Sequence, residues 1–281
     1  MLTPCRSKHA VAAAIIAALA TSSLVHASPV TIETGTSYDG FTLTGGSGTL
    51  SFSSSLITAL NVGKITLTQD APATVNETYV TTPPFGTTRT GASANAPITS
   101  VTLESSSNEV LSVATAGGAT MTASPLAGVS LGGTLSVTNI TVDLSNKRIY
   151  ASITGNFTGV ANNTYAAYDN TDITTKNNFY LWNFANITGP TTLTAYGASN
   201  QITGLTITTD GYKHLVSALR LYELGATTLQ SVTDYGSIAS VIPSSVLDDG
   251  PATNLPEPST YAMSALGLAM IAAARRFNRK V

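Results

Sequence analysis

Cysteine is almost absent from this 281-residue chain, because the only one is Cys5, close to the N-terminus. A mature protein without the N-terminal segment would have no thiol, which excludes disulfides, a thiolate nucleophile and cysteine metal ligands. Histidine is nearly as scarce, since only His214 lies outside that segment. A metal site built on several histidines is therefore excluded, and no Gly-x-Ser-x-Gly sequence accompanies His214 to indicate a Ser-His-Asp triad.

Charged side chains are the second shortage. They make up 10% of the chain, against about 25% in an ordinary soluble domain. Between residues 28 and 255, seven Lys and Arg residues stand against fourteen Asp and Glu residues, so this region has a net charge of 7 − 14 = −7. It has no basic stripe to follow a phosphate backbone, which argues against nucleic acid as a partner.

Residues 1–27 have the features of a signal peptide. A basic start with Arg6 and Lys8 precedes an apolar core, and small residues follow near Ala27. This order is typical of segments that signal peptidase removes. We expect cleavage after Ala27, which makes Ser28 the mature N-terminus; an uncleaved anchor is the alternative.

The C-terminus consists of three parts. Pro256-Glu257-Pro258 comes first, the apolar run Tyr261 to Ala274 follows, and a basic end begins with Arg275 and Arg276. The prolines favour an extended chain. As a helix, the apolar run would be about 21 Å long, which is shorter than the roughly 20-residue helix that a permanent membrane span needs. We therefore expect a short, transient transmembrane helix with its basic end in the cytoplasm. The alternative is a membrane anchor that is never processed.

This arrangement closely resembles the PEP-CTERM sorting signal of Gram-negative bacteria. The resemblance covers residues 256–281 only. It implies an exosortase-type processing enzyme as a partner, in addition to signal peptidase. It also implies an exported protein that is anchored in the inner membrane before processing and then reaches the cell surface or the extracellular space. On this division, residues 28–247 form the exported domain and residues 248–255 a linker.

The exported domain shows the period-two alternation of β-strands. We expect strands at residues 48–52, 64–68, 98–103, 109–113, 134–137, 140–144, 147–153, 179–184, 191–196 and 201–208. The phase changes near Asn139, which indicates a β-bulge, and Ser145-Asn146 predicts a tight turn. Residues 81–97, rich in Pro, Gly, Thr and Ala, are expected to form an exposed loop. The strand spacing predicts a mainly antiparallel β-sandwich.

One segment has helical spacing instead. From Asp210 to Leu224 the apolar residues recur every three or four positions, Asp210 can cap the start and Gly225 follows the end. We expect one amphipathic helix near the C-terminal end of the domain, covering an open end or edge of the sheet. A strand over residues 219–222 is the alternative.

The sequence contains few candidates for chemistry. Two pairs of carboxylates, Asp169 with Asp172 and Asp248 with Asp249, lie in loop-like stretches without the ligand pattern of a calcium loop. We interpret them as solvated turn residues, although a pair of carboxylates is sufficient for glycoside hydrolysis. We therefore expect no catalytic residue, no metal, no cofactor and no enzyme activity.

Aromatic residues give the one indication of ligand binding. If residues 180–184 form a strand, Tyr180, Trp182 and Phe184 share one face, which could stack on a ligand but is more typical of a core. The hairpin at residues 142–153, followed by this segment, also resembles HtaA-type domains, which bind haem through a tyrosine. That resemblance assigns no ligand residue here.

These observations predict an exported structural or adhesive protein of the cell surface or extracellular matrix, with extracellular polysaccharide as a partner. The alternatives are a surface domain that binds a carbohydrate or haem and, third, a matrix polysaccharide hydrolase.

Overall fold

A computed structural model describes residues 28–84, 86–157 and 173–246. Residue contacts divide the chain into two units, residues 1–246 and residues 247–281. The expected signal peptide, the linker and the expected transmembrane helix at residues 261–274 lie outside the described residues. Within the described ranges, no helix is both long enough and apolar enough to cross a membrane.

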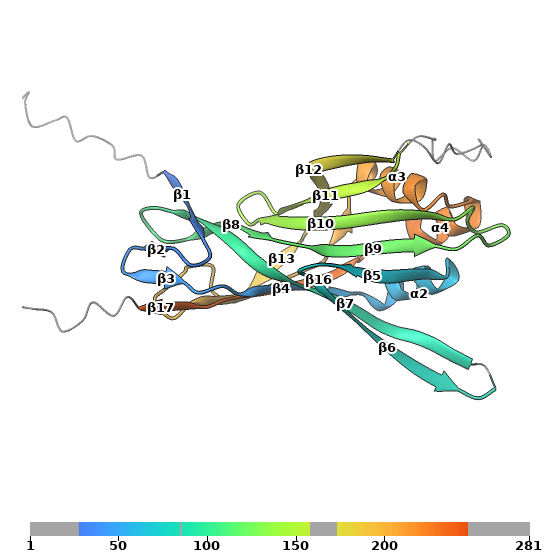
Figure 1. The fold of residues 1–281 in the computed structure, drawn as a ribbon, viewed down its shortest axis with the longest axis horizontal. Helices are drawn as coiled ribbons and strands as arrows, with labels where there is room; N and C mark the ends of the chain where they lie inside the picture. The colour runs from blue at the N-terminus through green and yellow to red at the C-terminus, as the bar shows by residue number, and fades with distance from the viewer. Residues whose placement is uncertain (1–27, 85, 158–172, 247–281) are drawn as a thin grey trace, which may run out of the picture. The chain divides into compact units, whose positions relative to one another are not determined.

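The described chain is mainly antiparallel β-structure (Figure 1). One sheet joins fourteen strands: β1 (Pro29–Glu33), β4 (Ser47–Phe52), β5 (Ile65–Asp70), β6 (Thr74–Thr82), β7 (Gly86–Glu104), β8 (Val110–Thr115), β9 (Gly118–Ala123), β10 (Gly133–Asp143), β11 (Arg148–Asn156), β12 (Ile173–Asn183), β13 (Asn186–Thr188), β14 (Ala198–Thr203), β15 (Thr206–Ile207) and β16 (Gly236–Ile242). A second sheet has three strands: β2 (Ser37–Tyr38), β3 (Phe41–Leu43) and β17 (Ser244–Val246).

The 19-residue strand β7 joins two halves of the large sheet. Its first part pairs with β4 and β6, and its last part pairs with β1 and β8. The halves share a core, because Leu50 and Ile238 from one half belong to the same buried cluster as Val137 and Ile149 from the other. The sheet therefore curls so that its two halves face a common interior, and β7 makes them continuous.

Three helices complete the described chain: α2 (Ser54–Val62), α3 (Thr209–Ala218) and α4 (Glu223–Gln230). Helix α2, which we did not predict, begins where the Ser53 hydroxyl accepts from the Leu56 N–H at 3.1 Å, a normal N-cap. Its buried face contributes Leu56 and Leu60 to the main core.

The expected single helix from Asp210 is two helices. Helix α3 ends at Ala218 with Leu219 as its C-cap, and Arg220 follows with a φ of 52°, which interrupts the helix. The Tyr222 N–H then donates to the carbonyl of Val129 at 2.8 Å rather than to a helical partner. The alternative strand at residues 219–222 is also wrong, since its only pairing is an isolated bridge between Leu221 and Ser130.

The hairpin of β10 and β11 confirms its prediction, including the irregularity near Asn139. The register shifts between Thr138 and Thr141, and Asn139 has a φ of 51°. The prediction of a loop at residues 81–97 is wrong, because most of this segment belongs to β7. Residues 191–196 are not a strand and form only isolated bridges, such as that between Thr192 and Glu109.

Candidate functional site

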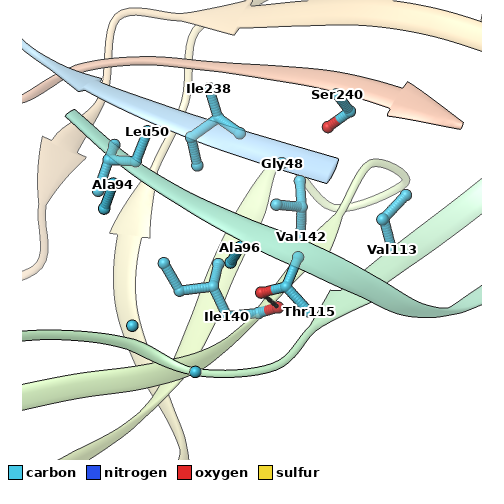
Figure 2. Close-up of a pocket in the computed structure, with 12 residues that line it drawn as sticks. Gly48, Leu50, Ala94, Ala96, Val113, Thr115, Ile140, Val142, Ile238 and Ser240 are labelled. Atoms are coloured by element: carbon cyan, nitrogen blue, oxygen red, sulfur yellow. Dashed lines mark hydrogen bonds between the residues drawn. The ribbon is translucent and has the colours of Figure 1, made fainter. Parts of the chain in front are cut away.

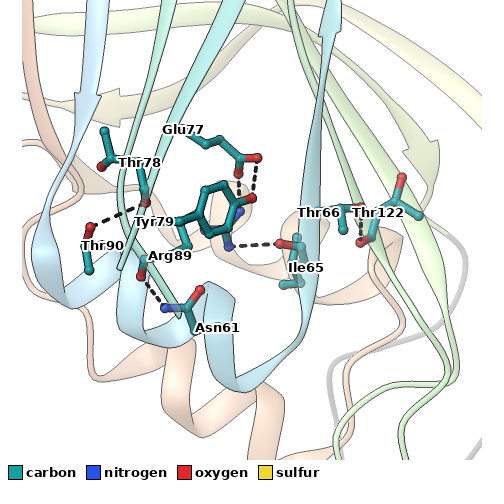
Figure 3. A network of polar contacts seen from close by, with 9 residues as sticks. All are labelled: Asn61, Ile65, Thr66, Glu77, Thr78, Tyr79, Arg89, Thr90 and Thr122. Carbon is teal, nitrogen blue, oxygen red and sulfur yellow. Dashed lines mark hydrogen bonds and ion pairs between the residues drawn. The ribbon is translucent and has the colours of Figure 1, made fainter. Parts of the chain in front are cut away.

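A bulge in the hairpin of β6 and β7 brings several polar side chains together (Figure 3). Thr78 lies opposite Gly91, and Tyr79 lies opposite Arg89, so Thr90 is an extra residue in β7. Bulges of this kind redirect the neighbouring side chains. Here the redirected residues include the only two charged side chains in the sequence between Asp70 and Glu104.

Arg89 is the centre of this cluster. Its Nη1 donates to Glu77 Oε1 at 2.6 Å and its Nη2 to the Ile65 carbonyl at 2.9 Å. The Arg89 side chain is only 5% exposed, against 20% for Glu77. Asn61 on α2 donates through Nδ2 to the Arg89 carbonyl at 2.8 Å. Arg89 thus ties the hairpin to both β5 and α2.

Glu77 in turn fixes the orientation of an exposed aromatic ring. The Tyr79 hydroxyl donates to Glu77 Oε2 at 2.8 Å, while Tyr79 as a whole is 54% exposed. This hydrogen bond, together with the nearby negative charge, raises the pKa of Tyr79. The hydroxyl therefore stays protonated at neutral pH and keeps its bond to Glu77.

The cluster borders a surface hollow of about 350 Å³. The hollow is lined by Leu60, Asn61, Lys64, Ile65, Thr66, Tyr79, Thr87, Thr88 and Arg89. One exposed aromatic ring thus stands beside an amine, an amide and several hydroxyls. A site that combines an aromatic face with several converging polar groups is suited to bind a polar, non-ionic ligand such as a sugar.

A second cavity lies inside the curled sheet, as Figure 2 shows. It measures about 30 Å³ and is lined mainly by Gly, Ala, Val, Ile and Leu side chains. Thr115 is one of its few polar residues, and its hydroxyl already donates to the Ile140 carbonyl at 3.0 Å. This cavity reflects the small side chains where the two halves meet, and its volume is too small for a ligand much larger than a water molecule.

His214 packs against two aromatic rings. Its ring lies 4.5 Å from the Phe157 ring and 5.0 Å from the Phe179 ring, centroid to centroid. Burial lowers the pKa of His214, and the nearby positive charge of Lys176 lowers it further. The described surroundings thus favour a neutral, structural histidine.

The expected aromatic face does not form as predicted. Trp182 and Phe184 belong to the main core, whereas Tyr180 stacks on Tyr150 at 5.5 Å between ring centroids. The register shift between β11 and β12 places Tyr180 opposite the half-buried Tyr150 and Trp182 opposite the fully buried Ile149. An extra residue between them therefore puts the two rings on opposite faces of the sheet.

Most of the remaining predicted residues lie outside the part of the chain that the structure describes. This holds for the four candidate aspartates and for the processing and membrane residues Ala27, Pro256, Glu257, Pro258, Tyr261, Ala274, Arg275 and Arg276. Ser28 is the first described residue, and its N–H donates to the Ser105 hydroxyl at 3.1 Å. In the part of the chain that the structure describes, no three His, Cys, Asp or Glu side chains are grouped to hold a metal.

The sequence prediction missed the hollow because it assigned residues 81–97 to a loop. A usable signal was present, since Glu77 and Arg89 are an opposite-charge pair in an otherwise uncharged stretch. An isolated pair of this kind indicates that the two side chains form an ion pair, because burying one charge without a partner is energetically unfavourable.

Comparison with known proteins adds information about the tail. Residues 254–280 match the family described as the PEP-CTERM protein-sorting motif. The chain therefore carries this motif at its C-terminus, as the resemblance predicted, and the motif implies an exported protein handled by an exosortase-type enzyme.

The comparisons say less about the described residues. No curated protein matches the chain. Among solved structures, the haem-binding protein HtaB from Corynebacterium glutamicum is similar with a TM-score of 0.43 and 12% identity, over 78% of this chain and 98% of that one.

Proposed function

We propose that this chain is an adhesive protein of the cell surface or extracellular matrix that binds an uncharged polysaccharide in the hollow beside Tyr79. Export and sorting follow from the PEP-CTERM motif. The observation that carries the binding step is the exposed Tyr79 ring, held in place over a polar hollow by Glu77 and Arg89.

The chemistry of the hollow fits a sugar. The ring offers a flat apolar face for the C–H groups of a pyranose, and its orientation is already fixed by the hydrogen bond to Glu77, so little conformational entropy is lost on binding. Asn61, Lys64 and Thr87 supply donors and acceptors around it. The ion pair of Arg89 and Glu77 is internally neutral, which leaves Lys64 as the only unbalanced charge in the lining.

The net charge selects the type of polysaccharide. Residues 28–255 carry a net charge of −7, and a field of that sign repels an acidic polymer at low ionic strength. A single lysine does not reverse this. The proposed ligand is therefore a neutral polysaccharide of the matrix.

The test compares Tyr79→Ala with Tyr196→Ala in the protein as its host exports it. Tyr196 is 91% exposed and does not line the hollow, so it controls for the loss of a surface tyrosine. We expect Tyr79→Ala to weaken retention on neutral matrix polysaccharide by about tenfold, the equivalent of one aromatic contact, and Tyr196→Ala to leave it unchanged. Equal retention of both variants and the wild type would show that the hollow is not the binding site.

The proposal includes no catalytic step. Glu77 is the carboxylate next to the hollow, and its two oxygens accept from Arg89 and Tyr79. Incubation of the exported protein with the same polysaccharide is expected to release no new reducing ends. Steady release that is lost on changing a single carboxylate would replace adhesion with hydrolysis.

A further inference from the structure

Two tyrosine rings lie in contact across strands β11 and β12. Tyr150 and Tyr180 are direct partners in the register of the two strands. Their ring centroids are 5.5 Å apart and the ring planes are tilted by 37°, a separation typical of aromatic rings in contact. Their sequence neighbours Ile149 and Leu181 are buried, whereas both tyrosines are half-buried. The pair therefore lies on the outward face, where solvent reaches it.

Neighbouring side chains hold the two rings in this arrangement. The Tyr180 hydroxyl donates to Asn183 Oδ1. The Arg148 guanidinium lies 5.1 Å from the centre of the Tyr180 ring, which is a cation–π contact. A hydrogen bond with Tyr150 raises the pKa of Arg148, so the same guanidinium lies beside both tyrosines. The two rings are thus positioned before any reaction takes place.

Two phenols in contact can be joined by oxidation. A one-electron oxidant takes an electron and a proton from a tyrosine hydroxyl and leaves a phenoxyl radical, whose unpaired electron is shared with the ring carbons ortho to the oxygen. Two such radicals form a carbon–carbon bond between one ortho carbon of each ring. The hydrogen atom on each of these carbons then moves to the oxygen of its own ring, which restores both phenols. The product, dityrosine, has two hydrogen atoms fewer than the two tyrosines.

We propose that Tyr150 and Tyr180 are the site of an oxidative cross-link in the exported protein, with hydrogen peroxide as the oxidant. The peroxide accepts the two electrons and two protons that the tyrosines lose, and it becomes two molecules of water. Coupling within one molecule is favoured, because two reactants held in contact do not depend on a collision in solution.

Other described tyrosines lack this arrangement. Tyr38 contacts Phe41, with ring centroids 6.3 Å apart, and phenylalanine has no hydroxyl to oxidise. Tyr196 is 91% exposed, so its ring is open to a tyrosine of another molecule. Coupling at Tyr196 would therefore give covalent dimers, whereas coupling of Tyr150 with Tyr180 leaves the protein a monomer. The size of the product distinguishes the two reactions.

The cross-link would serve the purpose of a disulfide in a chain that cannot form one. Exported proteins are often stabilised by disulfides, but Cys5 is the only cysteine and lies in the expected signal peptide. A bond between Tyr150 and Tyr180 would fasten β11 to β12 and close the chain between them into a loop. Such a closure restricts the unfolded chain, as a disulfide does.

The experiment treats dilute exported protein with hydrogen peroxide and a haem peroxidase. It compares the wild type with Tyr150→Phe, which keeps the ring but removes the hydroxyl. The matched control is Tyr196→Phe, which removes the hydroxyl of a tyrosine outside the pair. Dityrosine fluorescence, intact mass and peptide mapping are measured on the monomer fraction, and denaturant unfolding is measured before and after oxidation.

Monomers of the wild type and of Tyr196→Phe are expected to become lighter by two hydrogen atoms and to yield a peptide that joins residues 150 and 180. Their unfolding midpoints should shift to higher denaturant concentration. Tyr150→Phe monomers should show neither change. An unlinked wild-type monomer, or an equal dityrosine signal in Tyr150→Phe, would overturn the proposal. Tyr150 does not line the hollow, so Tyr150→Phe should be retained on polysaccharide like the wild type, and the two proposals fail independently.

Discussion

Arg89 Nη1 lies 2.6 Å from Glu77 Oε1 across the hairpin of β6 and β7, with the arginine side chain 5% exposed. This pair differs in kind from the ion pair between Lys213 and Asp210, whose atoms are 3.4 Å apart and whose side chains are 60% and 74% exposed. The contrast makes a direct test of burial possible.

Glu77→Gln is expected to destabilise the protein by about 3 kcal/mol, because it leaves the buried Arg89 charge without its counter-ion. Asp210→Asn should change the free energy of unfolding by less than about 0.5 kcal/mol, since exposed pairs contribute little. Denaturant unfolding of both variants measures the difference. Similar small effects for the two would mean that solvent compensates Arg89 in the folded protein.

Two tyrosines with opposite hydrogen bonding give a second test. The Tyr235 hydroxyl is buried and has no partner among the described residues, whereas the Tyr212 hydroxyl donates to the Ala226 carbonyl at 2.9 Å. Tyr235→Phe is expected to stabilise by about 1 kcal/mol, and Tyr212→Phe to destabilise by about the same amount. Loss of stability in Tyr235→Phe would indicate a buried water bonded to that hydroxyl.

The same residues predict a response to alkaline pH. Burial raises the pKa of Tyr235, and burial also raises that of Tyr212. Above the ordinary tyrosine pKa of about 10, the unfolded chain loses these protons while the folded chain keeps them. Stability should therefore be constant below about pH 10 and fall as the pH rises further. Tyr235→Phe should show a shallower fall in denaturant unfolding, and an identical slope would contradict the assignment.

His214 predicts a response at acid pH. Burial lowers its pKa in the folded state, so the unfolded chain binds the proton more readily. The contribution of His214 is present above the ordinary histidine pKa of about 6.5 and is lost as the pH falls toward the folded value. His214→Phe keeps the ring packing between Phe157 and Phe179. If that variant loses stability between pH 6.5 and 5 as steeply as the wild type, another group is responsible.

The tail predicts a mass. The exported protein should begin at Ser28 and end near Pro256-Glu257-Pro258 after processing, because the sorting motif covers residues 254–280. Glu257→Ala should keep the chain at Val281 and in the membrane fraction, whereas Asp249→Ala should be processed normally. Intact-mass measurement of membrane and medium fractions tests this. A wild-type protein that always ends at Val281 would mean a permanent anchor.

Strands with alternating apolar residues could be predicted from the sequence, and others could not. The β10–β11 hairpin alternates, so its strands and its bulge were accessible. The hairpin of β6 and β7 has little apolar alternation near its turn, because most of its residues there are exposed. Its strands are defined by pairing with each other, a long-range relationship that local composition does not contain.

The helical region shows a different failure. The apolar spacing from Asp210 to Leu224 correctly predicted α3, but it continues past the point where the helix is interrupted before α4. The break arises because backbone groups of Leu131 and Tyr222 bond to residues distant in sequence, Arg220 and Val129. The candidate hollow was missed for a related reason, since α2, β5 and β7 contribute to it together.

The length of strand β7 determines how the two halves of the sheet unfold. A single 19-residue segment is hydrogen-bonded into both halves of the sheet. One half therefore cannot unfold without disturbing a strand that also belongs to the other half. Heat or a pulling force should therefore meet one cooperative barrier, and a load applied at the β6–β7 hairpin would pass along the backbone of β7 directly into the interior strands.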